Sequence, residues 1–167
     1  PLALPGAAGL LPARLYRPLD GADGACLLYF HGGGFRFLSK ESHWIFGVRF
    51  AQAGYTVYNI DYRLAPEHLY PCAIEDACLA TRTIIGDSRF GARDRNFVLA
   101  GESAGANLAL ACNFVGQTYD CLAFTIEMPF KDHDDNPEPA TGWSGARSKR
   151  LGQDVLSTLA VLVDELR

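Results

Sequence analysis

The sequence predicts a three-layer α/β fold in which a mainly parallel sheet is covered on both faces by helices. Three observations predict it. Short apolar runs of strand length alternate with longer segments in which apolar residues recur at helical spacing. Several of these runs end in a glycine-rich or charged turn before the next helical segment. Helices of this length between successive strands serve as crossovers, and crossovers place strands side by side in parallel.

Composition places the 167 residues among ordinary folded proteins. Apolar residues make up 49% of the chain and the formal net charge is −4, so a core of domain size can form. The acidic balance, without a basic cluster, argues against nucleic acid as a partner. No apolar run has the length of a membrane span and the opening residues lack a signal-peptide pattern, so we expect no membrane partner. The start at Pro1 rather than at a methionine suggests a fragment.

The cysteines indicate a compartment. An odd number of them without CxxC spacing cannot all pair, so we expect reduced, mostly buried thiols in a cytoplasmic protein. The five are Cys26, Cys72, Cys78, Cys112 and Cys121.

The first predicted strand of the central sheet is the apolar run from Ala25 to Phe30. It leads directly into His31-Gly32-Gly33-Gly34-Phe35. Three successive glycines allow backbone N–H groups to approach a ligand closely, which is what the stabilisation of a tetrahedral oxyanion requires. A merely flexible loop has a similar composition, but the position directly after a strand favours a functional loop.

The next segments predict one more strand between two helices. Residues 42–53 have helical spacing and stop at Gly54, and Tyr55 to Ile60 is rich in strand-forming residues. We expect the charges of the following segment, 61–67 (DYRLAPE), to pair within a rigid turn that braces the glycine-rich loop, as scaffold rather than chemistry. Pro71 then opens a helix that runs to Ile85.

The most informative stretch is a tight turn between a strand and a helix. Phe97 to Ala100 predicts a buried strand, Ala104 to Cys112 predicts a helix, and Gly-Glu-Ser-Ala-Gly (101–105) joins them. Such a turn presses Ser103 into a strained conformation, and a Cβ at Gly101 or Gly105 would collide with the neighbouring strand or helix. GxSxG also arises by chance as a simple turn, so its meaning depends on the other motifs.

Three motifs in this order, HGGG (31–34), DYRLAPE (61–67) and GESAG (101–105), resemble the hormone-sensitive-lipase-like branch of the α/β-hydrolase family. The resemblance runs from about Leu15 to Cys112. It implies a partial α/β-hydrolase fold and a carboxylesterase or lipase that acts on short acyl esters through an acyl-serine, without a cofactor. Ala106 stands where that family commonly has a second glycine.

The resemblance also implies roles for single residues. It implies Ser103 as the nucleophile and the N–H groups of Gly32, Gly33 and Ala104 as the oxyanion hole. The acid and the histidine that complete the catalytic triad of this family are not recognisable after Cys112. Because a serine hydroxyl is a weak nucleophile without a positioned base, we expect the isolated chain to have weak activity or none.

The last third of the chain resembles a different family. The segment TIEMPFKD (125–132), followed by Gly142-Trp143-Ser144, is similar to the C-terminal end of bacterial cytosolic zinc carboxypeptidases. This resemblance implies Glu127 as a stranded general base of an enzyme whose metal site is absent. No HxxE pair is present, so we expect no metal. We therefore divide the chain into residues 1–112, part of an α/β-hydrolase domain, and residues 113–167, a carboxypeptidase-like tail packed on it.

The tail has a physical interpretation of its own. Cys121 to Ile126 predicts a strand. In α/β-hydrolases the strand after the helix that follows the GxSxG turn pairs beside the strand before that turn, so the resemblance implies that Leu122 to Ile126 pairs with the strand at 97–100 and hides a sheet edge. This pairing would bring His133, among acidic neighbours, to the edge where Ser103 lies; a solvated loop histidine is the favoured interpretation. Ser144 is predicted to cap a final helix. Its apolar stripe, interpreted as core, consists of Leu151, Val155, Leu159, Leu162, Val163 and Leu166.

Two alternatives from other classes remain open. The first is a binding protein that keeps the hydrolase pocket and takes small acyl ligands without turnover. The second is a truncated or fused reading frame, or a carboxypeptidase remnant without its metal site, with no independent catalytic role. The oligomeric state is not predicted.

Overall fold

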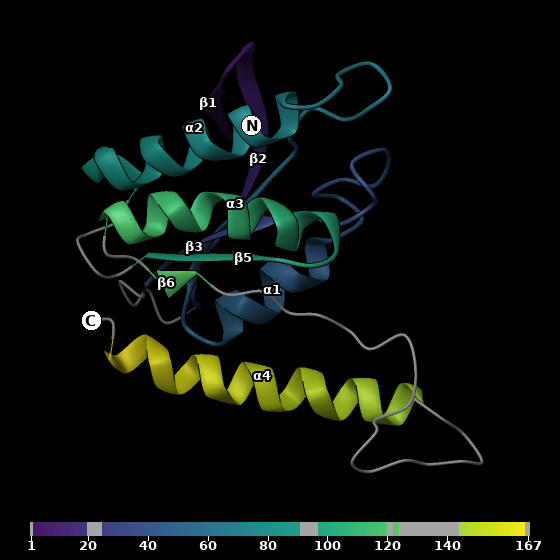
Figure 1. Cartoon of the computed structure of the whole chain (residues 1–167). Helices are drawn as coiled ribbons and strands as arrows, with labels where there is room; N and C mark the ends of the chain where they lie inside the picture. Colours follow the sequence, from purple (N-terminus) through teal and green to yellow (C-terminus); the bar gives the residue numbers. More distant parts are fainter. Residues whose placement is uncertain (1, 20–24, 91–96, 120–121, 124–143, 166–167) are drawn as a thin grey trace.

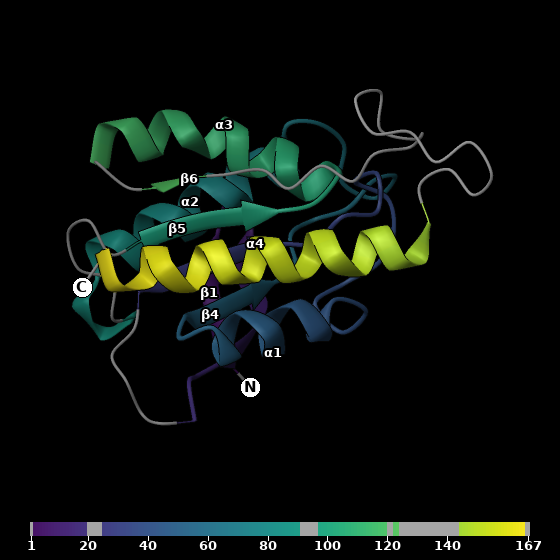
Figure 2. The ribbon, with the colours of Figure 1, turned by 90° about the horizontal axis from the view of Figure 1, so that it is seen from below.

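The computed structural model describes residues 2–19, 25–90, 97–119, 122–123 and 144–165. Within this part of the chain the strands form one six-stranded sheet in the order β1-β2-β4-β3-β5-β6. Helices α2 and α3 cover one face of the sheet and α1 and α4 the other (Figures 1 and 2). The predicted three-layer α/β architecture is therefore confirmed.

The elements have the following bounds. The strands are β1 (Leu2–Gly6), β2 (Gly9–Tyr16), β3 (Cys26–Phe30), β4 (Thr56–Ile60), β5 (Phe97–Gly101) and β6 (Leu122–Ala123). The helices are α1 (Trp44–Gln52), α2 (Cys72–Gly86), α3 (Ala104–Tyr119) and α4 (Gly145–Glu165), with a short 3₁₀ turn at Ser88–Phe90.

The central strands β4, β3 and β5 are the predicted apolar runs. Every residue of β3 and β5 is buried, as expected of parallel strands covered on both faces. Phe30 pairs with Ile60 on one side and with Gly101 on the other. The three strands thus end at the same level, and the turns that follow them emerge at one edge of the sheet.

The antiparallel hairpin of β1 and β2 is not predicted from the sequence. β1 pairs with β2, and β2 pairs antiparallel with β4, so the sheet is mixed at this end. The hairpin gives a weak signal because Pro12 interrupts the run and only alternate residues, Leu11 and Ala13, are buried. The backbone N–H of Ala7, in the turn, donates to Asp76 on α2 over 3.0 Å, which holds the hairpin against that helix.

The predicted helices lie close to their expected bounds. Gly54, which follows α1, has a φ of 98°, the left-handed conformation that a glycine allows just after a helix. Pro71 directly precedes α2, as predicted. α3 continues beyond Cys112 to Tyr119, so the proposed division at residue 112 falls inside a helix.

Helix α4 packs on the α1 side of the sheet. Leu159 is buried in a cluster with Tyr55 and Phe50, and Val155 and Leu156 pack against this cluster. The Tyr55 hydroxyl donates to the carbonyl of Leu159 over 2.6 Å. Val155 and Leu159 thus confirm the prediction for their part of the apolar stripe, whereas the side chains of 162–167 lie outside the described residues.

Two smaller predictions for the tail are also confirmed. The N–H of Arg147 donates to Ser144 Oγ over 3.3 Å, the geometry of a helix N-cap. β6 pairs parallel with β5, with Leu122 beside Val98; the rest of the strand predicted at 121–126 lies outside the described residues. None of the described helices combines the length and apolar character needed to cross a membrane.

Candidate active site

Ser103 lies in the two-residue junction between β5 and α3, directly before the helix. It has a φ of 53°, in the left-handed region where a residue with a side chain is strained by about 1–2 kcal/mol. The side chain of Ser103 is exposed, because the chain leaves the sheet and starts the helix within two residues. The predicted strained turn is therefore present.

The two glycines of this turn have no room for a side chain. A Cβ at Gly101 would overlap the backbone carbonyl of Gly105, and a Cβ at Gly105 would overlap the backbone carbonyl of Phe30 at the end of β3. The predicted collisions with helix and strand are thus both confirmed. Backbone atoms cannot move far to make room for a Cβ. Glycine at both positions therefore allows α3 to start directly against the sheet.

The glycine-rich loop lies beside this turn. A Cβ at Gly32 would overlap the carboxylate of Glu102, so the residue before Ser103 touches the loop that follows β3. Gly33 and Gly34 have φ values of 114° and 60°. The N–H groups of Arg36 and Phe37 donate to the carbonyl of Gly33, which closes the loop. Among the turn and loop hydrogen bonds of the described residues, none is donated by the backbone of Gly32, Gly33 or Ala104.

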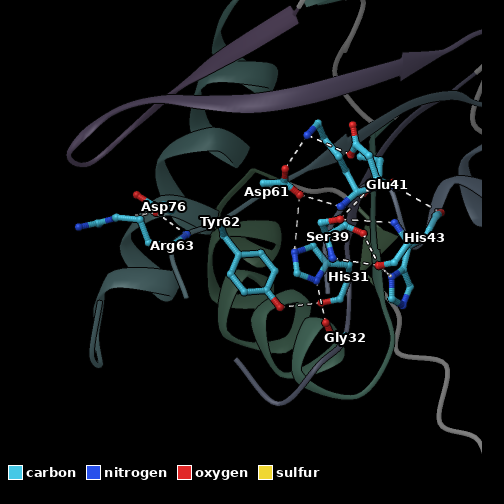
Figure 3. A network of polar contacts seen from close by, with 12 residues as sticks. His31, Gly32, Ser39, Glu41, His43, Asp61, Tyr62, Arg63 and Asp76 are labelled. Atoms are coloured by element: carbon cyan, nitrogen blue, oxygen red, sulfur yellow. Dashed lines mark hydrogen bonds and ion pairs between the residues drawn. The ribbon is translucent and has the colours of Figure 1, made fainter. Parts of the chain in front are cut away.

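His31 holds the start of this loop through contacts with Tyr62 and Gly32 (Figure 3). Its ring is fully buried and stacks on Tyr62 with 4.5 Å between the ring centroids. The Tyr62 hydroxyl donates to the carbonyl of His31 over 2.6 Å, and His31 Nδ1 lies 2.7 Å from the carbonyl of Gly32. Burial lowers the pKa of His31, so its ring is neutral near pH 7 and Nδ1 carries the donated proton.

The charges of segment 61–67 do not pair within their own turn, which corrects the prediction. Asp61 pairs with Lys40 over 2.5 Å, and Arg63 pairs with the fully buried Asp76 over 2.7 Å. The segment still braces the loop, through Tyr62 and through the N–H of Ala65, which donates to the carbonyl of Phe35 over 2.8 Å. The charges attach this brace to α2 and to the segment before α1, because an isolated buried carboxylate requires a partner.

Sequence reasoning missed the link between His43 and Glu102. His43 Nε2 lies 2.9 Å from Glu102 Oε1, and its Nδ1 lies 2.8 Å from Ser42 Oγ. Both ring nitrogens are therefore engaged, and the pair connects the start of α1 to the residue before Ser103. Partners so far apart in the chain leave no pattern in a single sequence.

A cavity of about 820 Å³ opens in front of Ser103. One wall is the turn at 101–103 with the loop at 33–38, a second is α1, and the third is α4. That α4 closes this cavity is not predicted from the sequence. The apolar side chains of the lining are Tyr29, Phe37, Leu38, Ile45, Phe46, Phe50, Leu151, Val155 and Leu156.

The structure does not describe the residues of the tail that the sequence singles out as candidate catalytic groups. Glu127, Asp132 and His133 lie outside the described residues. No hydrogen bond joins Ser103 Oγ to a side chain within the described ranges. Across those ranges, no group of three or more histidine, cysteine or acidic side chains is arranged to hold a metal ion.

Comparisons with known proteins agree on one family. The sequence profile of a family described as having the alpha/beta hydrolase fold matches residues 27–143, a range that continues beyond Cys112. The carboxylic ester hydrolase LipN of Mycobacterium tuberculosis is 40% identical over 115 residues, which cover 66% of this chain and 31% of that protein. Esterase LipI of the same organism is 42% identical over 113 residues, covering 65% and 35% of the two chains.

Solved structures give the same result. An esterase from Pyrobaculum calidifontis superposes with a TM-score of 0.66 at 36% identity, covering 74% of this chain and 42% of that one. A bacterial heroin esterase superposes with a TM-score of 0.66 at 28% identity, covering 75% and 42%. The chain thus spans about a third of the length of LipN and LipI and under half of these two structures.

Proposed function

Because the chain belongs to the α/β-hydrolase family, we propose that it carries the nucleophile-bearing part of a carboxylic ester hydrolase that acts through an acyl-serine intermediate. One observation carries the proposal above all. Ser103 stands strained at the sheet edge, on the wall of the cavity that it shares with Gly33 and Gly34. The names of LipN and LipI, an ester hydrolase and an esterase, support the same chemistry.

In this proposal Ser103 Oγ attacks the carbonyl carbon of a small acyl ester. The carbonyl oxygen becomes an oxyanion, and the N–H groups of Gly32, Gly33 and Ala104 donate hydrogen bonds to it. Because Ala104 is the first residue of α3, the positive end of that helix adds to the stabilisation. Collapse of the intermediate expels the alcohol and leaves an acyl-serine, which water then hydrolyses.

The proposal includes slow turnover by this chain alone, since no acid and histidine of a triad are recognisable after Cys112. His43 lines the same cavity as Ser103, but both of its ring nitrogens are already engaged. Without a base to accept the serine proton, the serine retains only the help of the oxyanion donors and of binding. We therefore expect turnover on the order of 10⁶-fold below that of complete triad enzymes, which leaves roughly 10³- to 10⁴-fold acceleration over the uncatalysed reaction.

The test is covalent labelling of the purified chain with a fluorophosphonate, followed by peptide mass spectrometry. We expect slow labelling at Ser103 and none in Ser103→Ala. Ser157→Ala is the matched control, because Ser157 is an exposed serine on α4 whose hydroxyl donates to the backbone carbonyl of Gln153; this variant should label like the parent. Absence of labelling at Ser103 under all conditions contradicts the proposal.

A second measurement examines the missing base. Imidazole is small enough for the cavity and can act as the base, so it should raise the rate at which Ser103 hydrolyses p-nitrophenyl acetate. The rate measured with Ser103→Ala gives the hydrolysis that imidazole causes by itself. Fast turnover without imidazole would contradict the proposed loss of the base and leave the nucleophile assignment intact.

A second candidate function is the binding of small acyl ligands without turnover. The apolar cavity favours it, together with the lack of a hydrogen bond from Ser103 Oγ to any described side chain. This candidate predicts saturable binding of short fatty acids with no labelling of Ser103. The division at residue 112 and a former general-base role for Glu127 also remain proposals.

A further inference from the structure

Two cysteines meet where α2 packs against α3, outside the lining of the cavity. Cys78 is on α2 and Cys112 on α3, and the two helices pack against each other over the same face of the sheet (Figure 1). Their sulfur atoms are 3.6 Å apart, and both thiols are reduced. A disulfide bond is about 2 Å long, so the sulfurs need to approach by only about 1.5 Å.

The surroundings of the two thiols give them different roles. A hydrogen bond from Cys112 lowers the pKa of Cys78 to about 7, against the effect of burial and with help from Arg82, one turn further along α2. A thiol of this kind is partly ionised at neutral pH, and the thiolate is the reactive form. Cys78 is also partly exposed, whereas Cys112 is fully buried. An oxidant in solution therefore reaches Cys78 first.

Cys26 shows how a buried thiol behaves without a second thiol beside it. It is also a free thiol in the core, but burial alone acts on it and raises its pKa. No second thiol is recorded beside it among the described residues. Burial without a partner thus makes a cysteine inert.

We propose that Cys78 and Cys112 form a redox site, at which a peroxide oxidises the two thiols to a disulfide that joins α2 to α3. The Cys78 thiolate attacks one oxygen of the peroxide, whose O–O bond breaks, and becomes a sulfenic acid as the first water leaves. The sulfur of Cys112 then attacks that of Cys78, the S–S bond forms and a second water leaves. In total two thiols lose two electrons and two protons, and hydrogen peroxide becomes two waters.

The direct test is to treat the reduced protein with a small excess of hydrogen peroxide and to map its peptides without reduction. We expect loss of two free thiols, an intact mass lower by two hydrogens and one cross-linked peptide pair containing Cys78 and Cys112. The bridge would close a long loop, so the melting temperature should rise by about 5–10 °C and return to its starting value with dithiothreitol.

Variants separate this pair from the other cysteines. Cys78→Ser and Cys112→Ala should each abolish the cross-link and the shift in melting temperature. Cys72→Ser, on the same helix and also partly exposed, should keep both. Because the mapping of the parent protein needs no variant, poor folding of Cys112→Ala would not remove the test. A cross-link from Cys78 to Cys72, Cys121 or a second chain, or no cross-link, would overturn the proposal.

Discussion

Two walls of the cavity, the one that carries Ser103 and the one formed by α4, differ in how closely their backbones are packed against neighbouring segments. On the wall that carries Ser103, a Cβ at Gly101 or Gly105 would overlap backbone atoms of a neighbouring segment, and a Cβ at Gly32 would overlap the carboxylate of Glu102. On the α4 wall, a Cβ at Gly145 or Gly152 would meet nothing within 4 Å. That helix is held by side chains such as Leu159 and by the hydroxyl of Tyr55. The first wall therefore tolerates almost no change, whereas the second is adjustable.

The largest effect should come from Gly105→Ala. Its new methyl group would overlap the carbonyl of Phe30 at the end of β3, so either α3 or the strand has to shift. We expect a loss of about 3 kcal/mol or more in the free energy of unfolding, measured by urea denaturation. A loss below about 1 kcal/mol would show that this wall is not constrained as described.

Leu159→Ala should have the next largest effect. Leu159 is 3% exposed and lies in the cluster that joins α4 to the sheet, so the substitution leaves a cavity and costs about 2–3 kcal/mol of stability. Val161→Ala is the matched control on the same helix, because Val161 is 65% exposed; its effect should stay within about 0.5 kcal/mol. Equal effects of the two variants would mean that α4 is not docked through this face.

Lowering the pH should lower the free energy of unfolding through His31, which holds the glycine-rich loop of the Ser103 wall. The pKa of this buried ring is lowered in the folded chain, whereas in the unfolded chain it returns to about 6.5. Below about pH 6.5 the His31 ring binds a proton in the unfolded chain but stays neutral in the folded chain. The contribution of His31 to the free energy of unfolding is therefore fully present above about pH 6.5 and is lost as the pH falls towards the lower pKa of the folded state.

The measurement is the free energy of unfolding at pH 8 and at pH 5.5. His31→Asn, whose amide can replace the hydrogen bond from Nδ1 to Gly32, removes the titrating ring. The difference between the two pH values should be smaller in this variant than in the parent. An unchanged difference would assign the acid sensitivity to other groups.

Gly152→Ala should have the smallest effect, and its sign is opposite. Gly152 lies inside α4 with open space around its Cα, so alanine gains helix propensity without a clash. We expect stabilisation by about 0.5–1 kcal/mol. The melting temperatures of Gly152→Ala and Gly105→Ala compare the two walls by the same glycine-to-alanine change. A lower melting temperature for Gly152→Ala than for the parent would contradict the open space described around Gly152.

The same contrast explains what could be predicted from sequence. The turn at Ser103 and the glycine-rich loop could be predicted from local sequence, because the spacing of glycines after an apolar run indicates the positions at which a side chain has no room. The cap at Ser144 and the stripe of α4 are local as well. The pairing of β6 beside β5 followed from the strand order of the resembling family.

What could not be predicted depends on contacts between distant segments. His43 and Glu102 meet across 59 positions, and Asp61 and Arg63 find their partners outside their own turn. The hairpin of β1 and β2 is interrupted by Pro12 and is stabilised by Asp76 on a helix far along the chain. The place of α4 on the cavity depends on which face of the sheet its apolar stripe covers, and periodicity alone does not specify a face.

We propose that the Ser103 wall holds the acyl group of an ester during the reaction. The most direct measurement is a crystal structure of the chain after reaction with a phosphonate. We expect a bond from phosphorus to Ser103 Oγ and a phosphonyl oxygen within hydrogen-bond distance of the N–H groups of Gly32, Gly33 and Ala104. A phosphonyl oxygen that points to solvent or to α4, away from those groups, would contradict it.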